Sequence, residues 1–293
     1  MQQARADLAQ QLSFAWQASL QCGLIALTTL MGYVAVASRV AARRVRWAFA
    51  AGVGLLAVVM AARLLWYRGS PGDYVWTAPF YAPLDGIATS AGTLEAAPVA
   101  VLDLLRRTID QERIAAVGRL LGVLCLVVGV LGLPARRWPR RGVLTTILAV
   151  LLLVVVGVNL GSQVDGPPVL DLLETAWPAL LVTLVAVGMA ILAGWRANRA
   201  WLLPTGALLV AIAAATAFDN LAGTWSVWWA LSNLRMVDPV SAVIGVSVDG
   251  LPQVSAAVET AVALAGPALL ATGAARVGAT TGPKTSSADY SAY

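Results

Sequence analysis

The chain has 293 residues, of which 59% are apolar and 12% are charged, and it contains no histidine. Its mean hydropathy of +0.77 excludes an ordinary soluble domain and indicates an integral membrane protein. The lack of histidine excludes histidine-ligated haem, the usual zinc and copper sites, and histidine acid–base catalysis.

Seven apolar stretches are long enough to cross a bilayer, because a transmembrane helix needs about 20 such residues. They predict an all-α, polytopic bundle of seven transmembrane helices over residues 1–276, followed by a disordered tail over residues 277–293. The expected spans cover residues 14–37, 47–66, 114–133, 142–160, 174–193, 200–217 and 256–275. The longer connections cover residues 67–113, 161–173 and 218–255.

Charge is sorted between the two sets of loops that alternate along these spans. Fourteen of the fifteen acidic residues fall in one set, and only Asp289 falls in the other. Basic residues near span ends stay in the cytoplasm, so we expect the N-terminus outside and the C-terminus inside. We attribute the basic excess to topology and anionic lipid headgroups and predict no nucleic-acid partner. The cytoplasmic set carries Arg39, Arg43, Arg44, Arg46, Arg136, Arg137, Arg140, Arg141, Arg196, Arg199, Arg276 and Lys284.

The first expected span is the most polar of the seven. Gln17, Gln21 and Thr28 share one helical face, because their spacings are four and seven residues. This face is predicted to look into the bundle, where it either makes interhelical hydrogen bonds or lines a pathway.

The connection before the third span contains an amphipathic stretch over residues 98–113. Leu105 and Ile109 lie on its apolar side, and Arg106 and Asp110 lie on the opposite side. We expect this helix to lie on the outer leaflet with its apolar side in the membrane, the alternative being a docking face for a partner. The tryptophan-rich segment 224–237 is also expected at this interface.

Small residues mark two of the expected helices. Gly118, Gly122, Gly129 and Gly132 predict a face for close packing on the third span. The pair Gly266 and Pro267 lies in the middle of the seventh span and predicts a kink. That kink is either a hinge in a moving helix or a proline that the membrane helix tolerates.

Four charged residues lie near the outer ends of the spans: Arg63, Arg119, Glu174 and Glu259. One interpretation makes them a polar cluster at the mouth of an outward-facing cavity. The other has arginines reaching to headgroups and glutamates at helix N-termini. We predict that at least one arginine–glutamate contact among the four is direct.

No residue pattern points to catalysis, a cofactor or a metal, and we expect no enzyme. The single lysine, Lys284, lies in the tail, and Cys22 and Cys125 both lie in apolar spans. A lipid-linked transferase that uses Asp73 or Asp85 on the outer face is the remaining enzymatic alternative.

The sequence therefore predicts a non-enzymatic membrane-embedded subunit or scaffold of a bacterial envelope complex. Its expected partners are the lipid bilayer and either other membrane subunits or further copies of itself. The alternative is a small-solute or ion transporter or channel with an outward-facing polar mouth. The alanine-, arginine- and valine-rich, lysine-poor composition is typical of a GC-rich bacterial genome, which favours a cytoplasmic membrane location.

Overall fold

The computed structural model describes residues 25, 27–34, 36, 42–68, 97–133, 139–162, 169–196, 201–233 and 252–279. The all-α class is confirmed for these residues, which are helical apart from a few at helix ends. Residues 27–34 are helical and precede six helices with defined bounds. These are α2 (Arg43–Arg68), α5 (Ala97–Leu131), α6 (Pro139–Ser162), α7 (Val169–Arg196), α8 (Leu202–Asn233) and α10 (Pro252–Ala279).

Five of these helices, α2, α5, α6, α7 and α8, are long and apolar enough to cross a membrane. They correspond to five of the seven expected spans, which supports a multi-pass membrane protein. In α10, the apolar part is the shorter stretch Val262–Val277. The first expected span falls mostly outside the described residues. Because α10 continues to Ala279, the first three residues of the expected tail 277–293 are helical, and the rest of that tail lies outside the described residues.

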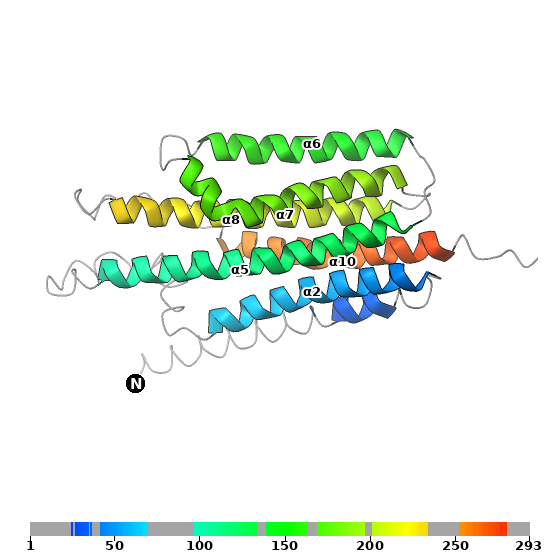
Figure 1. Ribbon diagram of the computed structural model, residues 1–293, viewed down its shortest axis with the longest axis horizontal. Helices are drawn as coiled ribbons and strands as arrows, with labels where there is room; N and C mark the ends of the chain where they lie inside the picture. Colours follow the sequence, from blue (N-terminus) through cyan, green and yellow to red (C-terminus); the bar gives the residue numbers. More distant parts are fainter. Residues whose placement is uncertain are drawn as a thin grey trace, which may run out of the picture.

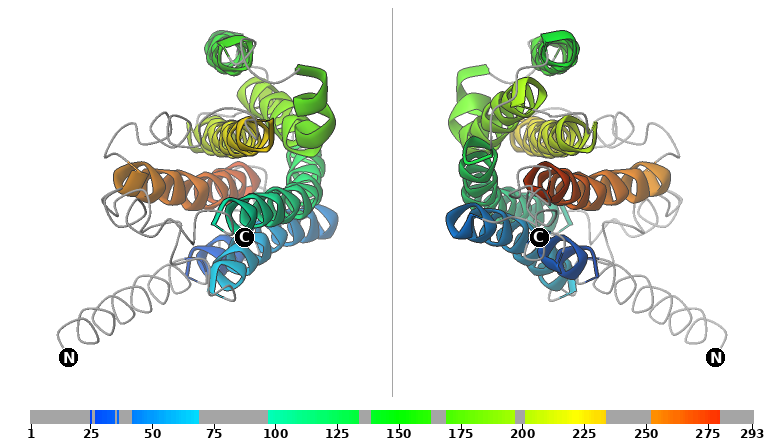
Figure 2. Two further views of the ribbon diagram at one scale, coloured as in Figure 1. Left: turned by 90° about the vertical axis from the view of Figure 1, so that its left-hand side faces the viewer. Right: turned by 90° about the vertical axis from the view of Figure 1, so that its right-hand side faces the viewer.

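The helices lie side by side along one axis (Figure 1). Seen end-on, α6 stands at one edge, α7 and α8 come next, α5 and α10 follow, and α2 lies at the other edge (Figure 2). The residue contacts agree, because α7 packs on α8, α8 on α10, and α5 on both α2 and α7. Consecutive helices alternate in direction, so Arg43, Arg140 and Arg196 lie at the same end of the bundle, which we call the basic end.

Prolines account for several features of the helices. Pro139 and Pro252 are the first residues of α6 and α10, where the missing N–H has no intrahelical partner to lose. Pro178 lies inside α7, and the amino-terminal part of that helix is bent away from the rest (Figure 1). A proline inside a helix removes one backbone hydrogen bond, which explains the bend.

One apolar cluster, the main cluster, fills the bundle and draws residues from α2, α5, α6, α7, α8 and α10. Phe49, Leu126, Met189, Leu203 and Leu270 are fully buried in it. The predicted small face of α5 is confirmed. A Cβ at each of its glycines would meet α2, from Val59 near Gly118 to Val45 near Gly132.

Helices α8 and α10 touch through their backbones. A Cβ added at Gly206 would lie 2.3 Å from the Leu270 nitrogen, and one at Gly273 would lie 2.5 Å from the Leu203 nitrogen. Gly266 is part of the same contact, because its Cβ would lie 3.0 Å from the Val210 nitrogen. Small residues allow this approach, which brings the two helices within dispersion range along a shared face.

Two helices are longer than expected, and this corrects the predicted loop boundaries. α5 has 35 residues and α8 has 32. They would measure about 52 and 48 Å, whereas the hydrocarbon core of a bilayer is about 30 Å thick. Both extend at the end opposite the basic end (Figure 1). Parts of the expected connections 67–113 and 218–255 are therefore helical continuations of the spans.

The expected surface helix over residues 98–113 is thus the first half of α5. Its amphipathic pattern is confirmed where side chains are described, since Leu105 and Ile109 are buried and Arg106 and Asp110 are exposed. The expected contact of this apolar side with the membrane surface is wrong for Leu105 and Ile109. The bundle itself buries them, because no glycine or proline breaks the helix between Pro98 and Gly118.

A side chain of α7 binds the end of α5 at the basic end. The Arg196 guanidinium, at the end of α7, donates hydrogen bonds to the carbonyls of Val130, Leu131 and Leu133. Those carbonyls belong to the last turn of α5 and the residues just after it, where helix ends leave carbonyl oxygens short of partners. The Val130 carbonyl also accepts the Leu133 N–H at 3.2 Å. Arg196 therefore caps one helix from another, in addition to its expected role in topology.

We predict that Arg196→Gln lowers the free energy of unfolding by about 2 kcal/mol, since hydrogen bonds from a charged donor contribute about 1.5–3 kcal/mol. The measurement is reversible unfolding in mixed micelles. Arg140→Gln is the matched control, because Arg140 is exposed at the same end and the change in charge is equal. Equal losses in the two variants would refute the capping role.

Candidate functional site: a buried ion pair in α5

The buried face of α5 follows a strict alternation of four- and three-residue spacings. Such a seam is typical of a helix that packs along its whole length against neighbours. Two of its eight positions are charged, namely Glu112 and Arg119. The seam consists of Leu105, Ile109, Glu112, Ala116, Arg119, Val123, Leu126 and Val130.

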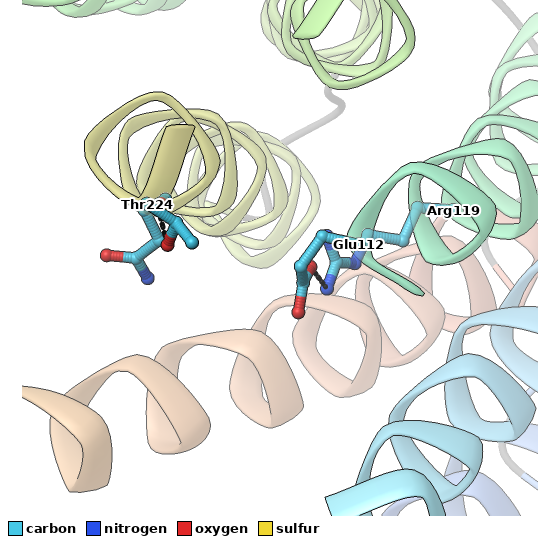
Figure 3. A network of polar contacts seen from close by, with 4 residues as sticks. Glu112, Arg119 and Thr224 are labelled. Carbon is cyan, nitrogen blue, oxygen red and sulfur yellow. Dashed lines mark hydrogen bonds and ion pairs between the residues drawn. The ribbon is translucent and has the colours of Figure 1, made fainter. Parts of the chain in front are cut away.

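Glu112 and Arg119 form an ion pair within this seam. The Nη2 atom of Arg119 lies 3.3 Å from Oε2 of Glu112, and the two side chains are 13% and 11% exposed. The residues are two helical turns apart, and the arginine side chain extends along the helix to reach the carboxylate (Figure 3). Thr224 of α8 lies across from Glu112, and its hydroxyl donates to the Asn220 carbonyl at 2.8 Å (Figure 3).

The pair lies where two apolar clusters meet. Val123 belongs to the main cluster, whereas Ile109 and Ala116 belong to a second one, the end cluster. Because Arg119 lies between Ala116 and Val123 on the seam, the ion pair interrupts an otherwise continuous apolar core. The end cluster contains Ile109, Ala116, Leu172, Ala176, Ala179, Phe218, Leu221, Ala222 and Trp225.

Helix geometry indicates the depth of the pair. Arg119 lies about 18 Å and Glu112 about 28 Å along α5 from Leu131 at the basic end. A hydrocarbon core of about 30 Å that begins near Leu131 would end close to Glu112. With the membrane placed in this way, Arg119 lies at membrane depth, and its side chain extends towards the boundary, as long basic side chains do. The carboxylate of Glu112 neutralises its charge there.

A second polar contact lies at a similar depth. The Asn159 Nδ2 atom of α6 donates to Oδ1 of Asp219 on α8 at 3.4 Å, and both side chains are exposed. Asp219 is about 25 Å along α8 from Leu202, and Asn159 is about 28 Å along α6 from Arg140. Charged and amide side chains of three helices thus mark one level, which corresponds to the expected outer boundary of the membrane.

One of the four predicted charged residues, Arg119, forms an ion pair in the structure. Its partner, Glu112, was not among the residues predicted from the sequence. Glu174 is exposed near the start of α7, and within the described part of the chain no ion pair involves it. The backbones of Arg63 and Glu259 are in α2 and α10, but their side chains lie outside the described residues. The predicted direct contact among the four stays a prediction.

The other predicted residues divide between described and undescribed parts of the chain. Gln17 and Gln21 lie outside the described residues. Thr28 is half-buried, and its hydroxyl donates to the Ile25 carbonyl of its own helix at 3.1 Å. Gly266 and Pro267 are buried in α10, where Gly266 serves the contact with α8. Movement at this point stays a prediction.

A signal for Glu112 is present in the sequence. It precedes Arg119 by seven residues, which places both on one face of a continuous helix. The expected span boundary at residue 114 separated the two residues and hid the pattern. Chemically, the site offers a cation and an anion held together on one helix, an arrangement that suits a structural lock or a breakable gate.

The comparisons with known proteins do not add to this picture. No protein-family model, no curated protein and no solved structure matches the chain.

Proposed function

We propose that the chain is a non-enzymatic subunit or scaffold of a larger assembly in a bacterial cytoplasmic membrane. In this proposal it has seven spans, with the N-terminus outside and the C-terminus in the cytoplasm. The supporting observation is the main cluster, which is made of aliphatic side chains, Phe49 and Met189. Its buried hydroxyls, Thr145 and Thr183, bond to carbonyls of their own helices. A core of this kind serves packing, since solute pathways and proton relays need polar groups within the membrane.

The exposure of α6 suggests where a partner binds. In its most apolar stretch 17% of the residues are buried, against 56% in α7 and in α8. Large side chains such as Leu151, Val154 and Val158 are exposed on a helix at the edge of the bundle (Figure 2). Helices of a neighbouring subunit would bury this surface.

The experiment is purification from the native membrane in a mild detergent, followed by native mass spectrometry. We expect a complex in which this chain and other chains have a fixed ratio. Val158→Trp on α6 is expected to reduce the complex. Val128→Trp on α5 is the matched control, because the two side chains are 64% and 61% exposed. A monomer as the only species would contradict the proposal.

The alternative, a transporter or channel, is favoured by one observation, the Glu112–Arg119 pair. An ion pair between two apolar clusters, at the level of the outer boundary, has the position of a gate. This alternative predicts a water-accessible path along the first span.

Accessibility to water tests that alternative. In a chain with Cys22 and Cys125 replaced by serine, Gln21→Cys and Thr28→Cys would react with a membrane-impermeant thiol reagent if they line a path. Val128→Cys, exposed on α5 and outside the proposed partner surface, is the lipid-facing control and would stay unreacted. Failure of both test positions to react would remove the transporter alternative.

A further inference from the structure

An apolar groove runs between the helical residues 25, 27–34 and 36 and α2. It has a volume of about 560 Å³ and is lined on one side by Ile25, Thr29 and Gly32 and on the other by Val53, Gly54 and Ala57. The groove exists because α2 presents small residues along this line. A Cβ at Gly54 would have no atom within 4 Å.

The groove has the length of one membrane leaflet. Along α2 its lining extends from Phe49 to Ala61. Twelve helical residues rise about 18 Å, and half of the hydrocarbon core is about 15 Å. Its walls are apolar, so its contents must be apolar as well.

At the basic end the groove opens into a smaller hollow of about 220 Å³. The two share Tyr33 and Ala50, and the lining of the smaller one is completed by Val36, Arg43, Arg46 and Trp47. The first turn of α2 carries three arginines, Arg43, Arg44 and Arg46, and no acidic residue. Tyr33 and Trp47 are 51% and 62% exposed, as expected of aromatic side chains at a membrane interface.

We propose that this groove binds one anionic glycerophospholipid of the leaflet at the basic end. An acyl chain occupies the apolar groove, and the phosphate lies between the guanidinium groups of Arg43 and Arg46. Arginine suits this role because its planar donors match phosphate oxygens in pairs. A helix of another chain would fill the groove as well, but it would not need two arginines at one end. The proposal is independent of the proposed function.

The first test is native mass spectrometry of the full chain in detergent with added dioleoylphosphatidylglycerol or dioleoylphosphatidylcholine. We expect one retained phosphatidylglycerol and weaker retention of phosphatidylcholine. The double variant Arg43→Gln/Arg46→Gln should weaken phosphatidylglycerol binding roughly twenty-five-fold, because each basic residue near an anionic lipid contributes roughly fivefold. The control Arg44→Gln/Arg140→Gln removes the same charge from two exposed positions outside the hollow and should bind normally.

The second test fills the groove. Gly54→Leu should abolish retention of phosphatidylglycerol, because the new side chain enters open space and occupies the position of the acyl chain. Gly157→Leu is the matched control, since Gly157 on α6 also has open space at its Cβ and lies outside the groove.

Four results of these two tests would overturn the proposal. They are equal retention of the two lipids, equal losses in the two arginine double variants, normal lipid binding by Gly54→Leu, and a change of oligomeric state in Gly54→Leu without loss of lipid. Glycerol phosphate without acyl chains should bind at least tenfold more weakly than the lipid, since burial of each CH₂ contributes about 0.8 kcal/mol, or roughly fourfold. Equal binding would assign the arginines to a free phosphate and would also overturn the proposal.

Discussion

Glu112→Leu is expected to destabilise the protein by about 3–5 kcal/mol, because it leaves the Arg119 guanidinium at membrane depth without its carboxylate. The arginine is 13% exposed and follows the apolar seam of α5, so water does not replace the lost partner fully. The free energy of unfolding, measured by steric trapping in bicelles, reports this loss directly. The effect should be among the largest of any single substitution in α5.

The double variant Glu112→Leu/Arg119→Met gives the decisive comparison. Replacing both charges by apolar side chains of similar size restores a continuous seam, and such replacements of buried pairs are often neutral or stabilising. We therefore expect the double variant to lie within about 1 kcal/mol of the wild type, well above Glu112→Leu alone. A double variant as unstable as the single one would show that the two residues are not coupled.

The same double variant distinguishes a structural role of the Glu112–Arg119 pair from a functional one. If it is stable and the partner complex or the transport activity persists, the pair is a device for packing and for setting the register of α5. If it is stable and either function is lost, the pair belongs to the mechanism. This distinction matters because buried ion pairs are weak evidence for stability on their own.

The seam of α5 shows which features of the fold the sequence alone predicts. Apolar runs predicted the existence and approximate centre of the described spans, because about 20 apolar residues in a row have few other stable arrangements. The same reasoning began the third span at residue 114, because Glu112 and Arg113, which precede it, lower the hydropathy. The four- and three-residue spacing continues through that point to Leu105. Periodicity, rather than hydropathy, would have predicted the full length of α5 and the burial of Glu112.

Other features depend on tertiary contacts that no local pattern reveals. Arg196 was expected on the cytoplasmic side, but its bonds to the carbonyls at the end of α5 require α7 and α5 to end side by side. The groove beside α2 depends in the same way on how residues 25, 27–34 and 36 pack. The sequence alone does not distinguish Gly54 from Gly52. In the structure, a Cβ at Gly52 would collide with Leu126, whereas a Cβ at Gly54 would have no atom within 4 Å.

The second large effect is expected from Gly206→Ala, which should lower the free energy of unfolding by about 3 kcal/mol, near the upper end for overpacking. A single methyl group at this position would lie 2.3 Å from the Leu270 nitrogen and 2.8 Å from the Gly266 oxygen. Both obstacles are backbone atoms, so no rotamer change relieves the clash. The two helices must separate, and the buried contacts that Leu203 and Leu270 make in the main cluster weaken with them.

Gly223→Ala is the matched control for this prediction, since it makes the same change in the same helix. A Cβ at Gly223 has no atom within 4 Å, so the methyl group is accommodated without movement. Alanine also favours the helix over glycine by about 0.5–1 kcal/mol, so this control should be neutral or slightly stabilising. A similar loss in both variants would mean that α8 tolerates no added volume anywhere. A loss confined to Gly206→Ala would assign the effect to the backbone contact with α10.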